Sequence, residues 1–112
     1  TKYLGGYQTQ AYELLQAGIK LPDDAQLIIA GQHDKVVHSV LSGKADAGFV
    51  RTEILENMSS NGDFTLSEVK ILNPQKLKHF PFISSTRLYP EWPVVALPHV
   101  ELKTVSHIAS AL

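Results

Sequence analysis

The chain has 112 residues, of which 44% are hydrophobic and 19% charged, so it is long enough for one globular domain or lobe and too short for two. Ten Lys and Arg stand against eleven Asp and Glu, and the net charge of −1 argues against a nucleic-acid partner. The absence of cysteine excludes disulfides, thiol catalysis and thiolate metal sites.

The first predicted element is a helix over about residues 6–17. Apolar residues from Tyr7 to Leu15 recur there at helical spacing, and Gly18 follows as a stop signal. After a proline turn, residues 25–30 form a short continuous apolar run. Such a run predicts a buried strand.

The next predicted helix is capped by Asp34 and ended by Gly43. Its apolar residues share one face, which leaves His38 pointing toward water. That face consists of Val36, Val37, Val40 and Leu41. Residues 45–50 are a second apolar run, which predicts another buried strand.

A third helix is expected before Gly62, because Ile54, Leu55 and Met58 share one side. Residues 69–72 are a third predicted strand. Strands that alternate with helices of this length usually pair in parallel through right-handed crossovers. The pattern therefore predicts an α/β fold with three layers, α-β-α, in which helices cover both faces of a mainly parallel sheet.

The composition of the sequence changes from Asn73 to Pro98, where five prolines exclude a long helix and favour extended chain. Residues 94–97 are the predicted strand within this connector. A final amphipathic helix is expected from the spacing of Val105, Ile108, Ala109 and Leu112.

The beginning of the chain favours a piece excised from a larger protein. It starts at Thr1 without an initiator Met, its one methionine is Met58, and a helical pattern begins almost at once. The sequence contains no secretory signal pattern and no apolar run near the ~20 residues that span a bilayer.

Candidate binding residues lie where the chain enters a predicted helix or leaves a predicted strand, which is where open α/β sheets hold ligands. His33 and Asp34 precede one helix, whose unpaired N–H groups favour an anion, and His33 either contacts that anion or merely caps the helix. Arg51 and Thr52 follow a strand, where the guanidinium would clamp an oxyanion or pair with nearby Glu53 or Glu56.

Two further segments are candidates for ligand contact. The sequence Gly5-Gly6-Tyr7 opens a helix, where glycine lets backbone amides approach a ligand, although an ordinary flexible start is the alternative. Residues 84–87, Ser-Ser-Thr-Arg, offer hydroxyls and a cation, and the aromatic rings of Tyr89 and Trp92 would line an apolar wall or pack in the core.

Catalytic and metal-binding patterns do not emerge. His33 and His38 are five residues apart, about 140° around a helix, so they cannot share a metal ion as an i, i+4 pair does. The sequence contains no GxSxG, HExxH or nucleotide-binding glycine motif. We therefore expect a binding domain that uses no cofactor and no metal.

Three segments together resemble the type II periplasmic binding domains of the phosphonate-binding-protein group, which include sensor regions of some bacterial histidine kinases. They are LGGYQ at 4–8, GQHDKVVHSVLSGKADAGFVRT at 31–52 and STRLYPEWP at 85–93. The last segment is more similar to the kinase-associated branch, of which tetrathionate sensors are members.

The resemblance implies two lobes that close on a small ligand. Residues 1–112 would form the second lobe and, from about residue 80, the return segment toward a first lobe that is missing from this sequence. It implies that the helix start at Gly5, Gly6 and Tyr7 faces the ligand and that His33 matches the cleft histidine of the family. Arg51 and Thr52 would line the same cleft. A missing opening strand would leave a sheet edge through which two copies could pair.

The leading hypothesis is a periplasmic ligand-sensing domain of a two-component sensor histidine kinase with a membrane-anchored parent. It would bind a small anion between the lobes and signal by hinge closure. The alternative is a solute-binding protein that delivers a phosphonate-like or other oxyanion to an ABC importer. An enzyme lobe is the third possibility.

Overall fold

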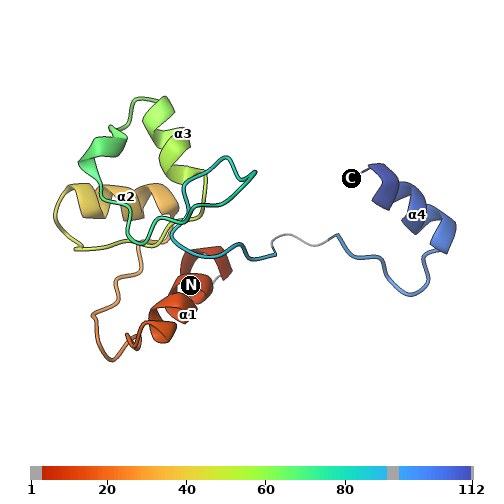
Figure 1. Cartoon of the computed structure of the whole chain (residues 1–112), viewed down its shortest axis with the longest axis horizontal. Coiled ribbons are helices and arrows are strands. Elements are labelled where there is room, and N and C mark those ends of the chain that lie inside the picture. The colour runs from red at the N-terminus through yellow and green to blue at the C-terminus, as the bar shows by residue number, and fades with distance from the viewer. Residues whose placement is uncertain (1–3, 91–93, 112) are drawn as a thin grey trace.

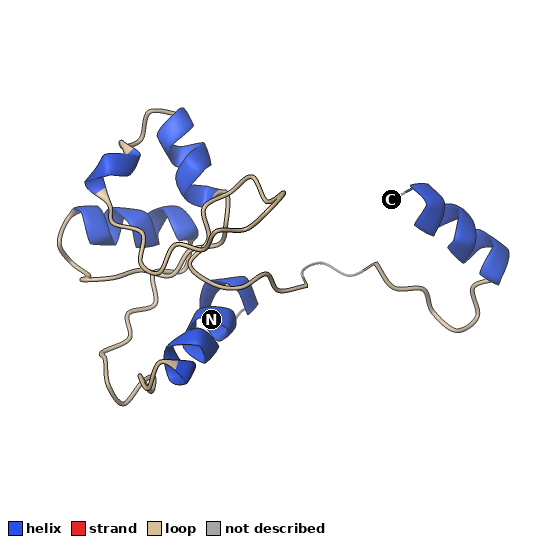
Figure 2. Cartoon of the chain, viewed as in Figure 1, coloured by secondary structure: helices blue, strands red, loops and turns tan. Residues whose placement is uncertain are grey.

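The computed structural model describes residues 4–90 and 94–111, and within them it contains helices and extended segments (Figures 1 and 2). The four α-helices are α1 (Thr9–Gln16), α2 (His33–Leu41), α3 (Ile54–Ser60) and α4 (Leu102–Ala111). A π-helical turn, Leu4–Gln8, leads into α1, and a 3₁₀-helix, Leu66–Glu68, follows α3. The four predicted helices are therefore confirmed, with the first one beginning in a π-helical turn.

The predicted glycine stops are also confirmed, as the end of α2 shows. Gly43 has a φ of +72°, its N–H donates to the Val40 carbonyl at 3.0 Å, and the Lys44 N–H donates to the Ser39 carbonyl at 2.9 Å. This left-handed closure satisfies two carbonyls that the helix itself cannot pair. The same two-bond pattern closes α1 after Gly18 and α3 after Gly62.

The predicted cap at Asp34 is wrong. The N-cap of α2 is Gln32, whose backbone is extended (φ −135°, ψ 152°), and the helix begins at His33. Asp34 lies inside the first turn, where its carboxylate favours the helix through the dipole and not through a capping bond. The imidazole of His33 consequently belongs to the first helical residue.

The four predicted strands are absent from the described residues. Segments 25–30, 45–50, 69–72 and 94–97 are not paired with one another, so the predicted mainly parallel sheet is not formed. A strand depends on a neighbour for its N–H and C=O groups, and sequence periodicity cannot supply that neighbour. The apolar runs were correctly located as non-helical chain, but their pairing was wrongly inferred.

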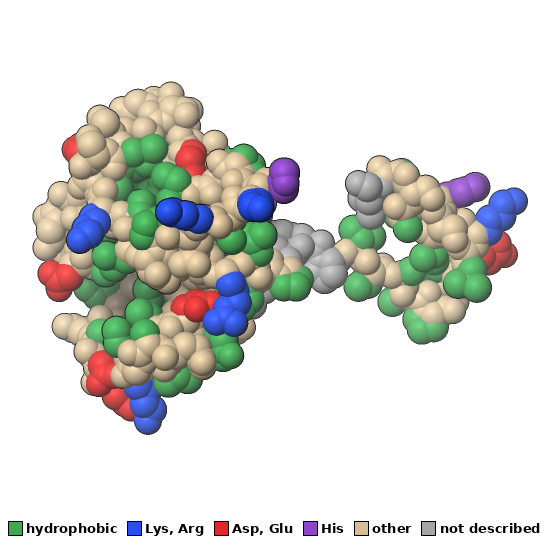
Figure 3. Space-filling model, viewed as in Figure 1, with side chains coloured by type: hydrophobic (Ala, Val, Ile, Leu, Met, Phe, Trp, Pro, Cys, Tyr) green, Lys and Arg blue, Asp and Glu red, His purple; other side chains and the backbone are tan. Residues whose placement is uncertain are grey.

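Two of these segments also expose apolar side chains, and the first of them was predicted to be buried. Ile29 is 76% exposed in the first and Val95 is 78% exposed in the last. Figure 3 shows hydrophobic side chains on the surface of the C-terminal segment as well as on the main body. The predicted homodimer through a sheet edge loses its structural basis, because no sheet occurs in the part of the chain that is described.

The buried core lies between α2, α3 and the 3₁₀-helix. Its three buried apolar residues are Val37 (3% exposed), Met58 (7%) and Phe64 (8%). Partly buried residues pack against them: Leu41, Val50, Ile54, Leu55, Leu66 and Val69. The predicted apolar faces of α2 and α3 are thus confirmed, and His38 is exposed as expected.

The C-terminal helix packs on its own connector and lies apart from α1, α2 and α3 (Figure 1). An apolar hollow of about 280 Å³ lies between residues 94–97 and the face of α4 that carries Val105 and Ile108. The predicted member Leu112 of that face lies outside the described residues. In the ranges 4–90 and 94–111, every helix is too short or too polar to cross a bilayer.

Candidate functional site

The turn that opens the first helix meets the beginning of α2. A Cβ built on Gly6 would lie 3.6 Å from Cε1 of His33, which is ordinary van der Waals distance. The imidazole therefore lies close to the backbone of Gly6, with room for about one methyl group between the two. Two predicted site residues that are 27 positions apart in the sequence lie side by side.

The same turn also meets the segment that was predicted as the second strand. The rings of Tyr7 and Phe49 have centroids 6.4 Å apart and planes tilted by 51°, a favourable aromatic geometry. One helical turn further, Gln10 Nε2 donates to the Val50 carbonyl at 3.4 Å. These contacts bring the start of the chain to the residues directly before Arg51.

Arg51 and Thr52 form the turn into α3, and both side chains are half-buried. The next residue, Glu53, caps α3 with a φ of +77°, a left-handed conformation that costs energy for a residue with a side chain. The Glu56 carboxylate accepts the Ile83 N–H at 2.8 Å. Glu56, one candidate partner of Arg51, is thus engaged with the backbone of a distant segment.

The structure thus gathers most, but not all, of the predicted site residues. Gly6, Tyr7 and His33 lie together, and Arg51 and Thr52 directly follow the segment that Tyr7 and Gln10 contact. Gly5 belongs to the same π-helical turn. Asp34 is exposed in the first turn of α2, and no contact of its side chain joins it to this group.

Side chains of the hydroxyl and cationic group predicted at residues 84–87 bond to other parts of the chain. Ser84 is 7% exposed and its hydroxyl donates to the Thr86 carbonyl at 3.0 Å. Arg87 pairs with Glu13 on α1, at 2.7 Å between Nε and Oε1. Tyr89 donates to the same carboxylate, and Trp92 lies outside the described residues. These groups hold the structure together and do not gather at the candidate site.

Three residues of this region were missed by sequence reasoning: Gln10, Glu13 and Phe49. Gln10 lies four residues after Gly6, and this i, i+4 spacing places both on one helix face. That spacing was a usable signal for Gln10. Phe49 was interpreted only as scaffold, and nothing in the sequence indicated that Glu13 would meet residues 74 and 76 positions away.

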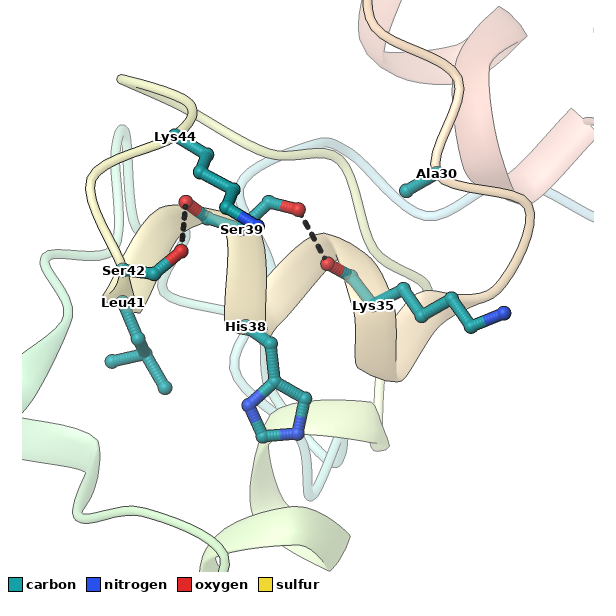
Figure 4. A pocket seen from close by; sticks show the side chains of 7 residues that line it. All are labelled: Ala30, Lys35, His38, Ser39, Leu41, Ser42 and Lys44. Carbon is teal, nitrogen blue, oxygen red and sulfur yellow. Dashed lines mark hydrogen bonds between the residues drawn. The ribbon is translucent and has the colours of Figure 1, made fainter.

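An open depression of about 680 Å³ lies on the other side of α2 and is a different feature (Figure 4). It contains none of the predicted site residues and is lined by Ala30, Lys35, His38, Ser39, Leu41, Ser42 and Lys44. The Ser39 hydroxyl donates to the Lys35 carbonyl and the Ser42 hydroxyl to the Ser39 carbonyl. In Figure 4 the ends of Lys35 and His38 point away from each other, so these two groups do not converge on one ligand.

The gathered residues offer a small set of chemical functions. An imidazole and a guanidinium can each hydrogen-bond the oxygens of an anion, and the paired rings of Tyr7 and Phe49 provide apolar surface. Among residues 4–90 and 94–111, no three His, Asp or Glu side chains are grouped so that they could hold a metal ion.

Comparison with known proteins agrees with this type of site. The whole chain, residues 1–112, matches the family model described as ABC transporter, phosphonate, periplasmic substrate-binding protein. No curated protein and no solved structure gives a significant match. Because the family match spans the full length, the chain belongs to the phosphonate periplasmic substrate-binding proteins of ABC transporters.

Proposed function

We infer that this chain forms one wall of the binding site of a periplasmic solute-binding protein whose ligand is a small oxyanion of the phosphonate class. The observation that carries this proposal is the proximity of Gly6 to the His33 imidazole, in the same helical turn whose Tyr7 ring pairs with Phe49. The family match supports solute binding. His33 and Arg51 would bind the oxyanion, and the aromatic pair would lie against its organic substituent.

Titration calorimetry with methylphosphonate, inorganic phosphate and sulfate tests this proposal on the protein as its gene encodes it. Loss of a hydrogen bond to a charged group costs about 1.5–3 kcal/mol, so His33→Ala should weaken methylphosphonate binding roughly ten- to hundredfold. His38→Ala is the matched control, because His38 is an exposed histidine on the same helix that lines the outer depression. Equal affinities for the two variants would refute the proposed role of His33.

The sensor-kinase hypothesis remains the alternative, and the segment STRLYPEWP at 85–93 is the observation that favours it. The comparisons give it no support, since the matching family is one of transport proteins. The gene decides between the two: a membrane-spanning segment and a kinase core in the same reading frame would favour the sensor, and an adjacent importer operon would favour the transporter.

A further inference from the structure

A second polar cluster joins α1 to a segment more than 70 residues away. The Glu13 carboxylate accepts three hydrogen bonds: from Arg87 Nε at 2.7 Å, from Arg87 Nη2 at 3.4 Å and from the Tyr89 hydroxyl at 2.7 Å. The guanidinium carbon also lies 5.9 Å from the ring centroid of Tyr12, within cation–π range. Both oxygens of one carboxylate are thus used to hold a single strip of chain.

This cluster differs from an ordinary surface ion pair, which contributes little because both partners stay solvated. The Glu13 side chain is only 20% exposed, whereas Arg87 is 61% exposed. The paired geometry and the third hydrogen bond fix the direction of the guanidinium as well as its distance. These hydrogen bonds, first from Arg87 and then from Tyr89, hold the pKa of Glu13 below its ordinary value.

The strip that Glu13 holds is also attached to other parts of the molecule, including residue 73, whose side-chain amide donates to the Ser85 carbonyl at 3.1 Å. The Ile83 N–H donates to Glu56 of α3 at 2.8 Å, and the carbonyl of buried Ser84 accepts the Gln75 N–H at 2.9 Å. In Figure 1 the chain beyond residue 80 passes between α1 and the pair α2 and α3. Residues 83–89 therefore connect the helix that begins with Gly6 and Tyr7 to the helix that follows Arg51 and Thr52.

We propose that Glu13 is a positioning residue, which locks residues 83–89 onto α1 and thereby sets the place of Gly6 and Tyr7 against His33. The strip acts as a brace between α1 and α3, and α3 packs through Met58 against Val37 of α2, the helix that begins with His33. Glu13 itself touches no ligand. Its effect on binding rests on the function proposed above, whereas its effect on the geometry of the free protein does not.

The test compares Glu13→Gln with Asp23→Asn in the free protein. Asp23 also forms an ion pair, at 3.2 Å with Lys20, but this pair is exposed and links only neighbours in the sequence, so it is a matched control. Glu13→Gln should speed amide hydrogen exchange at Ile83 and Thr86 about fivefold, the size of one lost hydrogen bond, and leave the amides at the end of α2 unchanged.

The second readout is the proton resonance of His33 Cε1, the atom that faces Gly6. It should shift in Glu13→Gln and stay in place in Asp23→Asn, and Tyr89→Phe, which removes one of the three bonds, should give a smaller shift. Unchanged exchange at residues 83–89, equal acceleration in α2, or an unmoved His33 resonance would each overturn the proposal.

Methylphosphonate titration of the same variants separates this proposal from the proposed function. If the wild-type protein binds, Glu13→Gln should weaken binding about fivefold, and wild-type affinity in that variant would overturn the positioning role. If the wild-type protein binds none of the oxyanions while exchange and resonance respond as expected, the brace is supported and the proposed ligand class fails.

Discussion

Gly48 packs directly against α2, and adding one methyl group there should destabilise the fold. A Cβ built on Gly48 would lie 2.6 Å from Cγ1 of Val36 and 3.1 Å from Cγ2 of Val40. Carbon atoms prefer a separation of about 3.5–4.0 Å, so the first contact falls short by roughly 1 Å. Val36 cannot swing away easily, because a β-branched side chain in a helix has one strongly preferred rotamer.

Two opposing effects set the size of the change in Gly48→Ala. Overpacking of this kind costs about 1–3 kcal/mol. Replacing glycine by alanine lowers the entropy of the unfolded chain and returns about 0.4–1 kcal/mol, since Gly48 does not have a positive φ that would strain alanine. The midpoints of these two ranges give a net loss of about 1.3 kcal/mol in the free energy of unfolding, with an upper bound of about 2.6 kcal/mol, measured by urea denaturation with circular dichroism.

A double-mutant cycle with Val36→Ala tests the cause of this loss. Val36→Ala removes the methyl group that clashes, so the double variant should be more stable than the sum of the two single changes predicts, by about 1 kcal/mol. Gly6→Ala is the steric control, because its added Cβ would lie at an ordinary 3.6 Å from Cε1 of His33. A cycle that is strictly additive, or a Gly48→Ala protein at least as stable as wild type, would show that the close approach has been misinterpreted.

Two further predictions concern polar groups. Thr65→Ala should cost about 1 kcal/mol in the free energy of unfolding, because Thr65 and Glu68 form a reciprocal capping box at the 3₁₀-helix. The Thr65 N–H donates to the Glu68 carboxylate at 2.6 Å. An unchanged urea midpoint would contradict this prediction. The pKa of Glu13 is lower in the folded than in the unfolded chain, so its stabilisation is complete above the ordinary carboxyl pKa of about 4.3 and is lost as the pH falls through the lowered folded value. Wild type should therefore lose more stability than Glu13→Gln between pH 5 and the acid limit, and parallel acid titrations of the two would argue against the pairing.

The accuracy of the sequence predictions depended on whether an element is determined locally. Helices were located because their apolar spacing and terminal glycines are carried within a few residues, as α2 and Gly43 illustrate. The capping box was present as T-x-x-E at residues 65–68 but was not used. Strands were wrongly predicted, because an apolar run such as 25–30 indicates extended chain but not the partner with which it would pair.

Some residues of the candidate site were predicted from the sequence because they mark locally determined helix beginnings, and others were not. A glycine before one helix and a histidine at the start of another both mark helix beginnings. Gly6 and His33 were therefore chosen as candidate binding residues before their proximity was known. Phe49 was not selected, because its role depends on the approach of Tyr7 from 42 positions away.

Sequence patterns do not reveal long-range polar contacts, such as those that join residues 87 and 89 to Glu13 on α1. Arg87 was considered a ligand-binding cation, since a guanidinium on extended chain has no partner that its own sequence reveals. In the structure that guanidinium is bound to Glu13, and the pKa of Arg87 is raised by the bond. An anion that competes for Arg87 would have to displace the Glu13 carboxylate, which accepts hydrogen bonds from Nε and Nη2 of Arg87 and from the Tyr89 hydroxyl. Arg87 is therefore not available to a ligand in this arrangement, and its contact with Glu13 holds residues 83–89 on α1.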